Sequence, residues 1–167
     1  DAAGLAISED FKAKIRGLNQ AKRNANDGVS LAQTADGALK EIGGMLTRMR
    51  ELAVQSATGT INTTQRGYLD GDFTQLKSEI TRIANTSEST GINLLNGDSN
   101  TTPVNFQVGT GNSANDRLTL SIATATASAL ALNADTVSTV AGANAAISGL
   151  DTAIGNVSAR RANIGAM

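Results

Sequence analysis

The sequence predicts a mainly α-helical fold: an elongated antiparallel rod or bundle of three long helices with one small β-hairpin. Three long stretches repeat apolar residues about every 3.5 positions, the heptad spacing of helices that pack along a narrow seam. Aromatic residues make up only 2% of the chain and tryptophan is absent. A thin core of alanine, leucine, isoleucine and valine between helices is therefore favoured over a compact core built on large rings. No linker or internal repeat divides the chain, so residues 1–167 are treated as one domain.

The first helix is expected over residues 5–57. Its apolar or alanine positions are Phe11, Ile15, Leu18, Ala21, Ala25, Val29, Ala32, Ala35, Leu39, Ile42, Leu46, Met49 and Ala53. The same stretch contains Gly17, Gly28, Gly37, Gly43 and Gly44. Each glycine costs a helix about 1 kcal/mol relative to alanine, so neighbours must supply much of the stability. Two explanations stay open, namely close approach of other helices and simple tolerance at the surface.

The second helix is expected over residues 65–85. The stretch TGTINTT at 58–64 is typical of a break, and Thr64 is a suitable N-cap. The seam continues at Leu69, Phe73, Leu76, Ile80 and Ile83. The short connection predicts that this helix lies antiparallel on the end of the first one.

Residues 86–122 are expected to form a loop and a β-hairpin. Val104, Phe106 and Val108 alternate with polar residues, as do Leu118, Leu120 and Ile122. The Gly- and Asn-rich stretch GTGNSAND lies between the two segments and indicates the turn. An isolated hairpin is marginally stable in water, so it should lean on the helices.

The last helix is expected over residues 135–165, after an Ala-, Thr- and Ser-rich connection at 123–134 that has no clear assignment. Its seam positions are Val137, Val140, Ala143, Ile147, Leu150, Ile154, Val157 and Ile164.

Composition argues against several classes of function. Fourteen basic and fifteen acidic residues nearly balance, whereas nucleic-acid binding requires a basic excess. The chain has no histidine and no cysteine, which removes the commonest general base, the commonest metal ligands and any disulfide. No apolar run is long enough for a transmembrane helix. We expect no enzymatic activity, no cofactor, and neither nucleic acid nor membrane as a partner.

Two stretches superficially resemble ligand-binding motifs. YLDGDFTQLKSE contains Asp70, Asp72 and Glu79, but it lacks the ligand number of a calcium loop and keeps helical register throughout. GTGNSAND lacks the lysine and the strand-to-helix context of a phosphate-binding loop. We predict a solvated helix face and a hairpin turn. An enzyme is the least favoured hypothesis, and it would depend on Asp70 or Asp72.

The stretch LTRMRELAVQSA at 46–57 carries a seam at Leu46, Met49 and Ala53. Beside the seam are charged and polar residues and one further leucine: Arg48, Arg50, Glu51, Leu52 and Gln55. From spacing alone, this second face is either a contact surface for a partner or a solvated back.

Four stretches together resemble bacterial flagellin: DAAGLAISEDFKAKIRGLNQAKRNANDGVSLAQTADGAL, LTRMRELAVQSA, LKSEITRIANTSESTGINLLNG and FQVG. AISGLDTAIGNVSARRANIGA resembles the start of that family's C-terminal conserved region. The resemblance implies a structural, non-enzymatic subunit that is secreted by type III export and self-assembles into the extracellular filament used for motility. It also implies an elongated rod with a hairpin, outside a coiled coil of both chain ends. Residues 123–134 stand where many flagellins insert outer domains.

The resemblance leaves two other readings to be tested. A hook–filament junction protein of the flagellum is the alternative within the same machinery. A free-standing helical adaptor is the alternative from another class, and its gene need not encode more heptad sequence on either side. Because the ends that pair during filament growth are not part of this sequence, the fragment is expected to be soluble and monomeric.

The resemblance also assigns contact residues. In the family, the positions of Arg48, Leu52 and Gln55 contact neighbouring subunits, with Arg48 central. In the monomer, the same surface is recognised by the vertebrate innate immune receptor for flagellin, a Toll-like receptor. Thr47 replaces the usual glutamine, and Asp72 stands where recognised flagellins often carry glutamate. The expected partners are therefore other flagellin subunits and this receptor.

Overall fold

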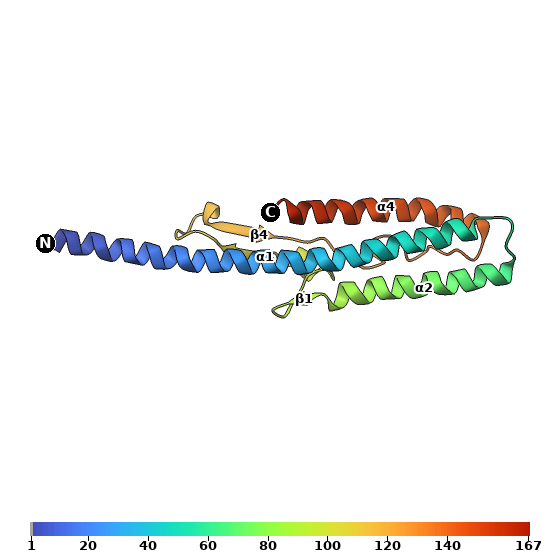
Figure 1. The fold of residues 1–167 in the computed structure, drawn as a ribbon, viewed down its shortest axis with the longest axis horizontal. Coiled ribbons are helices and arrows are strands. Elements are labelled where there is room, and N and C mark those ends of the chain that lie inside the picture. Colours follow the sequence, from blue (N-terminus) through green and yellow to red (C-terminus); the bar gives the residue numbers. More distant parts are fainter. Residues whose placement is uncertain (1) are drawn as a thin grey trace.

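The computed structural model describes residues 2–167, and its fold is a rod (Figure 1). One very long helix, α1 (Ala2–Ser56), runs most of its length. Two more long helices, α2 (Thr63–Thr86) and α4 (Val140–Gly165), pack along the C-terminal half of α1. The mainly helical class predicted from the sequence is confirmed.

Helix α1 begins earlier than expected and ends one residue sooner, at Ser56. Its seam is fully buried from Ala35 to Ala53, as the heptad spacing predicted. The buried seam residues there are Ala35, Leu39, Ile42, Leu46, Met49 and Ala53. We call residues 30–56 of α1 the covered half and residues 2–29 the uncovered half, because only the former lies between α2 and α4 (Figure 1).

Helix α2 starts at an Asn–Gln capping box rather than at the expected Thr64 cap. The Asn62 side chain accepts a hydrogen bond from the Gln65 backbone N–H (2.9 Å), and the Gln65 side chain accepts one from the Asn62 N–H (2.9 Å). This reciprocal pair satisfies two backbone donors at once. Phe73, Ile80, Ile83 and Ala84 form the buried face of the helix.

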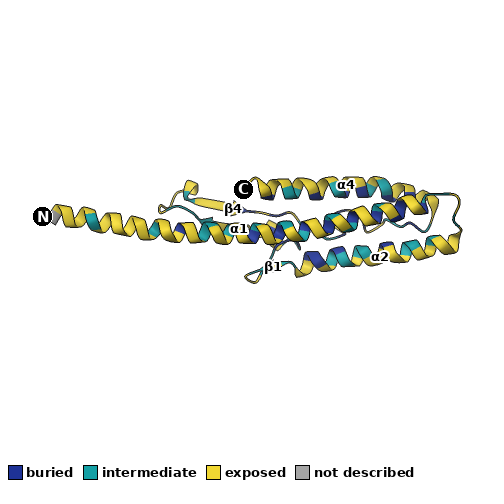
Figure 2. Ribbon diagram, viewed as in Figure 1, coloured by how far each residue is buried: buried dark blue, intermediate teal, exposed yellow. Residues whose placement is uncertain are grey.

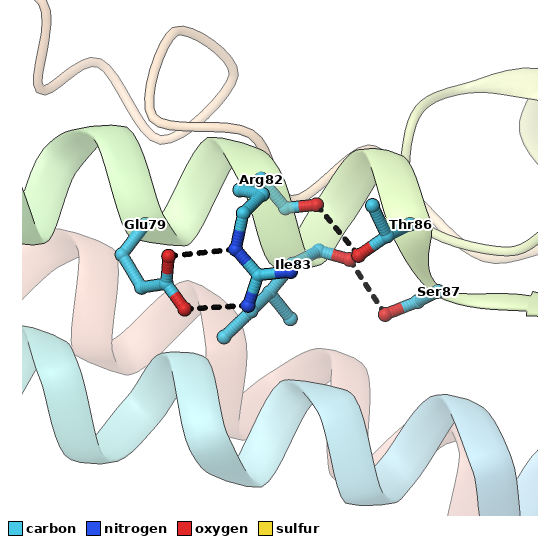
Figure 3. A network of polar contacts seen from close by, with 5 residues as sticks. All are labelled: Glu79, Arg82, Ile83, Thr86 and Ser87. Atoms are coloured by element: carbon cyan, nitrogen blue, oxygen red, sulfur yellow. Dashed lines mark hydrogen bonds and ion pairs between the residues drawn. The ribbon is translucent and has the colours of Figure 1, made fainter.

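The C-terminal end of α2 is closed by a polar network (Figure 3). Arg82 donates two hydrogen bonds to the Glu79 carboxylate, at 2.7 and 2.6 Å. These bonds hold the pKa of Glu79 below its ordinary value. The Thr86 hydroxyl donates to the Arg82 carbonyl, and both the hydroxyl and the backbone N–H of Ser87 donate to the Ile83 carbonyl. The last carbonyls of the helix thereby gain partners.

Two antiparallel hairpins follow α2. The first pairs β1 (Glu88–Ser89) with β2 (Ile92–Asn93), and its turn contains Thr90 and Gly91 at positive φ. After a single-turn helix, α3 (Asp98–Thr101), the second hairpin pairs β3 (Val104–Gln107) with β4 (Arg117–Leu120). The second hairpin is the predicted one, and the first was not expected.

The loop between β3 and β4 folds around the Asp116 side chain, next to the short 3₁₀ turn η1 (Ala114–Asp116). Ser113 donates to Asp116 Oδ2 from its hydroxyl (2.7 Å) and its backbone N–H (3.1 Å), which lowers the pKa of that carboxyl. A Cβ at Gly109 or Gly111 would collide with this carboxylate. Gly109 and Gly111 of GTGNSAND therefore leave room for the Asp116 side chain and not for a bound ligand.

The second hairpin docks on the uncovered half of α1. A Cβ at Gly28 would lie 3.3 Å from the Phe106 ring, and one at Gly17 would lie 2.9 Å from the Thr110 methyl group. Asn24 Nδ2 donates to the Gln107 carbonyl at 2.9 Å. These two glycines thus allow close approach of a hairpin, not of a helix. By contrast, nothing lies within 4 Å of a Cβ built at Gly37 or Gly44.

A strap, residues 121–139, connects β4 to α4 without helix or strand. Its apolar side chains are nevertheless buried: Ile122, Ala125, Ala127, Leu130, Leu132 and Val137. Helix α4 begins at Val140, capped by the Thr139 hydroxyl, and not at Asp135 as predicted.

The strap stays extended before α4 because α2 holds its backbone. The Asp70 carboxylate accepts hydrogen bonds from the Thr136 hydroxyl (2.6 Å) and the Val137 N–H (2.7 Å). Lys77 Nζ donates to the Asp135 carbonyl at 2.7 Å. The Lys77 bond engages the Asp135 carbonyl, which would have to accept from the backbone N–H of residue 139 if α4 began at Asp135.

Among the described residues, none of the helices is long and apolar enough to cross a lipid bilayer. The same residues contain no group of three or more acidic, His or Cys side chains arranged to hold a metal ion.

Candidate contact surface

The off-seam face of the covered half is exposed on α1. Arg48 and Glu51 form an ion pair at 2.7 Å, and 60% of each side chain remains accessible to solvent. Gln55, one turn further on, is also exposed. The Thr47 hydroxyl donates to the Gly43 carbonyl of the same helix at 3.0 Å. A partner could therefore reach Thr47, Arg48 and Gln55 along a single exposed stripe.

Leu52 does not belong to this stripe. Its side chain is 2% exposed and lies in the core with Met49 and Ala53. The prediction that Leu52 lies off the seam is wrong, because α1 is flanked by both α2 and α4 and buries a stripe wider than a heptad seam. In this conformation the Leu52 side chain packs in the core beneath the exposed stripe, and a partner cannot contact it directly.

Arg50 also lies outside the exposed stripe, because its side chain faces α4. Its Nε donates to Asp151 Oδ1 at 2.6 Å, which raises the pKa of the guanidinium above its ordinary value. The two arginines of LTRMRELAVQSA thus have different surroundings. Arg50 links two helices of the rod, whereas Arg48 pairs with Glu51 on its own helix.

Asp70 and Asp72 of α2 lie in different surroundings. Asp70 points toward the strap and holds Thr136 and Val137, as described above. Asp72 is exposed to solvent. Within residues 2–167, neither a hydrogen bond nor an ion pair connects Asp72 to Thr47, Arg48 or Gln55.

The uncovered half of α1 presents a second surface, visible as a long exposed stretch in Figure 2. Six large apolar side chains on it are between 55% and 66% exposed. They are Leu5, Ile7, Phe11, Ile15, Leu18 and Val29. Four of these six are seam positions predicted to be packed, so the heptad spacing continues past the part of the helix that this chain covers.

An apolar groove of about 740 Å³ lies where the two halves of α1 meet. Its walls come from α1, the second hairpin and the last turn of α4, and include Ala25, Val29, Phe106, Leu118, Leu120 and Ile164. The Arg161–Asp36 ion pair (2.7 Å) lies beside it, and the hydrogen bond from Arg161 lowers the pKa of Asp36.

Sequence reasoning missed this groove, since it depends on where the hairpin docks. Gly17 and Gly28 were the available signal. Two glycines eleven positions apart on a helix that otherwise follows a seam indicate close approach of another element, and here that element is the β3–β4 hairpin.

Comparison with known proteins identifies the family. Residues 1–101 match the family model described as the bacterial flagellin N-terminal helical region. The chain belongs to the flagellin family. The relatives that it matches are flagellins and a flagellar filament core protein.

Individual relatives extend this match to the whole chain. Flagellin from Halalkalibacterium halodurans is 43% identical over 167 residues, which is 100% of this chain and 61% of the relative. The flagellar filament 33 kDa core protein of Treponema phagedenis is 38% identical over 99% of this chain and 62% of its own length. The crystal structure of Bacillus cereus flagellin matches with a TM-score of 0.74 at 34% identity, covering 86% of this chain and 81% of that one. The chain therefore spans about three fifths of the curated relatives that it matches throughout.

Proposed function

We propose that this chain is the rod portion of a flagellar filament subunit, which acts outside the cell by assembling with further copies of the subunit. The uncovered half of α1 carries the proposal. Its exposed apolar residues continue the seam that is buried in the covered half. A seam of this kind costs solubility unless another helix covers it, and the filament provides such helices.

Charge along the uncovered half supports the same proposal. The uncovered half carries five basic residues (Lys12, Lys14, Arg16, Lys22 and Arg23) against three acidic ones (Glu9, Asp10 and Asp27), and Lys12 and Lys14 pair with Glu9 and Asp10 on the same helix, so a modest net positive charge remains. Two uncovered halves laid side by side would bring like charges together. The helix that covers this surface in the filament should therefore combine apolar seam positions with net negative charge.

The test uses the flagellar gene product that carries this sequence, produced in motile bacteria without their own flagellin. Ile15→Asp places a charge on the seam, whereas Asn19→Asp places the same charge at another exposed position of the helix and serves as the control. We expect filaments in electron micrographs for the wild type and the control and none for Ile15→Asp. Normal filaments with Ile15→Asp would contradict the proposal, and short caps in place of filaments for the wild type would favour a hook–filament junction protein.

The exposed stripe on the covered half supports a second role in recognition. We propose that Arg48, with Gln55, Thr47 and Asp72, contacts neighbouring subunits in the filament and the Toll-like innate immune receptor when the subunit is monomeric. A solvent-exposed arginine above a buried leucine is a suitable anchor for an interface.

A receptor reporter assay tests this role with Arg48→Ala. The control is Arg117→Ala, which removes an exposed arginine from the second hairpin. We expect Arg48→Ala to weaken signalling about tenfold or more and Arg117→Ala to leave it unchanged. Equal signalling by all three proteins would remove Arg48 from the receptor surface.

A further inference from the structure

We propose that Asn96–Gly97 is a site of spontaneous chemical modification, at which Asn96 loses its side-chain amide and becomes aspartate or isoaspartate. This is the only Asn–Gly pair in the sequence. It lies between two buried leucines and the short helix α3, in the loop that leads to the second hairpin.

The reaction joins two adjacent residues. The backbone nitrogen of Gly97, after losing its proton, attacks Cγ of Asn96 and forms a new C–N bond. The Cγ–Nδ2 bond then breaks, and Nδ2 leaves as ammonia after taking up a proton. The resulting succinimide ring is opened by water at either carbonyl, which gives aspartate or isoaspartate. The only co-reactant is water.

The attacking nitrogen is available in this structure. Within the described residues the Gly97 N–H donates no hydrogen bond, although the Gly97 carbonyl accepts bonds from the N–H groups of Asn100 and Thr101. Gly97 has φ +114°, a conformation that residues with a side chain rarely adopt, and a Cβ there would lie 2.9 Å from the Thr124 hydroxyl. Glycine is required at this position by the fold, and its lack of a side chain also leaves the path to Asn96 unobstructed.

The attacked carbonyl group is polarised. Asn96 Oδ1 accepts a hydrogen bond from the Asp98 N–H at 2.9 Å. Negative charge develops on this oxygen when Gly97 attacks, so the same N–H stabilises the tetrahedral intermediate in the way an oxyanion-hole donor does. Asn96 Nδ2 donates to Asp98 Oδ2 at 2.9 Å, and this bond orients the group that leaves.

The products fit the site less well than asparagine does. A carboxylate at position 96 faces the Asp98 carboxylate where the amide now donates a hydrogen bond. Isoaspartate adds a methylene to the main chain directly after Leu95, which is fully buried and whose carbonyl accepts a bond from the strap residue Ala125 at 2.8 Å. Modification should therefore loosen the attachment of the strap at this end.

The experiment is to incubate the folded chain at mildly alkaline pH, digest it with trypsin and follow the peptide of residues 83–117 by mass spectrometry. We expect a mass gain equal to replacement of NH by O, localised to residue 96 by fragmentation, with two isomeric products. Asn96→Gln should abolish the change at this position, and Asn112→Gln should leave it intact.

Two results would overturn the proposal. One is that Asn112, in the same peptide, converts before Asn96 in the folded chain. The other is that Asn96 stays intact in the folded chain while it converts in the free peptide of residues 83–117, since the fold would then protect this site.

Discussion

The two halves of α1 share one helix and one repeat but have different surroundings. In the covered half, α2, α4 and the strap bury the seam almost completely, whereas the second hairpin docks on the uncovered half and leaves most of its seam exposed (Figure 2). Leu46 is fully buried and Leu18 is 56% exposed, although both occupy seam positions. Periodicity thus reveals that a helix has a packing face, but the partner of that face must be found elsewhere.

The largest effect should come from truncating the seam in each half. Leu46→Ala should lower the free energy of unfolding by about 2–5 kcal/mol, because it leaves a cavity in the core. Leu18→Ala should change it by less than about 0.5 kcal/mol in the isolated chain, because little buried surface is lost. Urea unfolding followed by circular dichroism measures both. Similar losses in the two variants would mean that the uncovered half is packed in solution, for instance by self-association.

A substitution at Asp70 tests how much the attachment of the strap to α2 contributes to the stability of the chain. Asp70→Ala removes the acceptor for Thr136 and Val137 and should lower the free energy of unfolding by roughly 1.5–3 kcal/mol, the range for hydrogen bonds to a charged group. Asp72→Ala, a matched change on the exposed side of α2, should stay within about 0.5 kcal/mol. If the two variants unfold at the same urea concentration, the strap does not depend on Asp70.

Two glycines sharpen the comparison between open and occupied positions of α1. Gly37→Ala should stabilise the chain by about 0.5–1 kcal/mol, since alanine restricts the unfolded state and the new Cβ meets open space. Gly28→Ala should gain clearly less, because its Cβ presses on the Phe106 ring. Melting temperatures of the two variants give the difference. Equal increases in melting temperature would show that the second hairpin shifts on the uncovered half at little cost in free energy.

The smallest effects concern two aspartates whose pKa values shift in opposite directions. The pKa of Asp36 is lowered by the Arg161 hydrogen bond, so its contribution is present above the ordinary pKa and is lost as the pH falls through the lowered value. The pKa of Asp135 is raised by burial, so stability is lost as the pH rises through the raised value.

Stability curves against pH separate these two cases. At neutral pH, Asp36→Asn should destabilise and Asp135→Asn should stabilise the chain, each by less than about 1 kcal/mol because both sites are partly solvated. In strong acid, where both carboxyls are protonated, the two variants should approach the wild type. A destabilising Asp135→Asn at neutral pH would contradict the assignment of burial as the dominant cause.

Much of the fold follows from spacing, and the exceptions have physical reasons. The seam from Ala35 to Ala53 and the β3–β4 hairpin appear as predicted, because period and local turn signals determine them. Leu52 was placed wrongly because two flanking helices widen the buried stripe. The conformation of the strap could not be predicted from the sequence, because side-chain hydrogen bonds, rather than a repeating pattern, hold it in place.

The contact surface was predictable only in part. Exposure of Thr47, Arg48, Gln55 and Asp72 is compatible with the expected stripe, and their roles stay proposals. The start of α4 was misplaced because Val137 continues the apolar pattern of the helix, while the backbone at Asp135 and Val137 is held by α2. The groove depends on a long-range contact between hairpin and helix, which no local pattern specifies.

The continuity of α1 has a mechanical consequence. Its 55 residues form one unbroken helix, roughly 80 Å long at the usual rise per residue. No loop or hinge separates the half that belongs to this chain's own core from the half left open to others. A pull or twist applied at the open end must travel along the helix into the core as axial load and torsion, so a subunit built this way behaves as a stiff strut rather than as two jointed pieces.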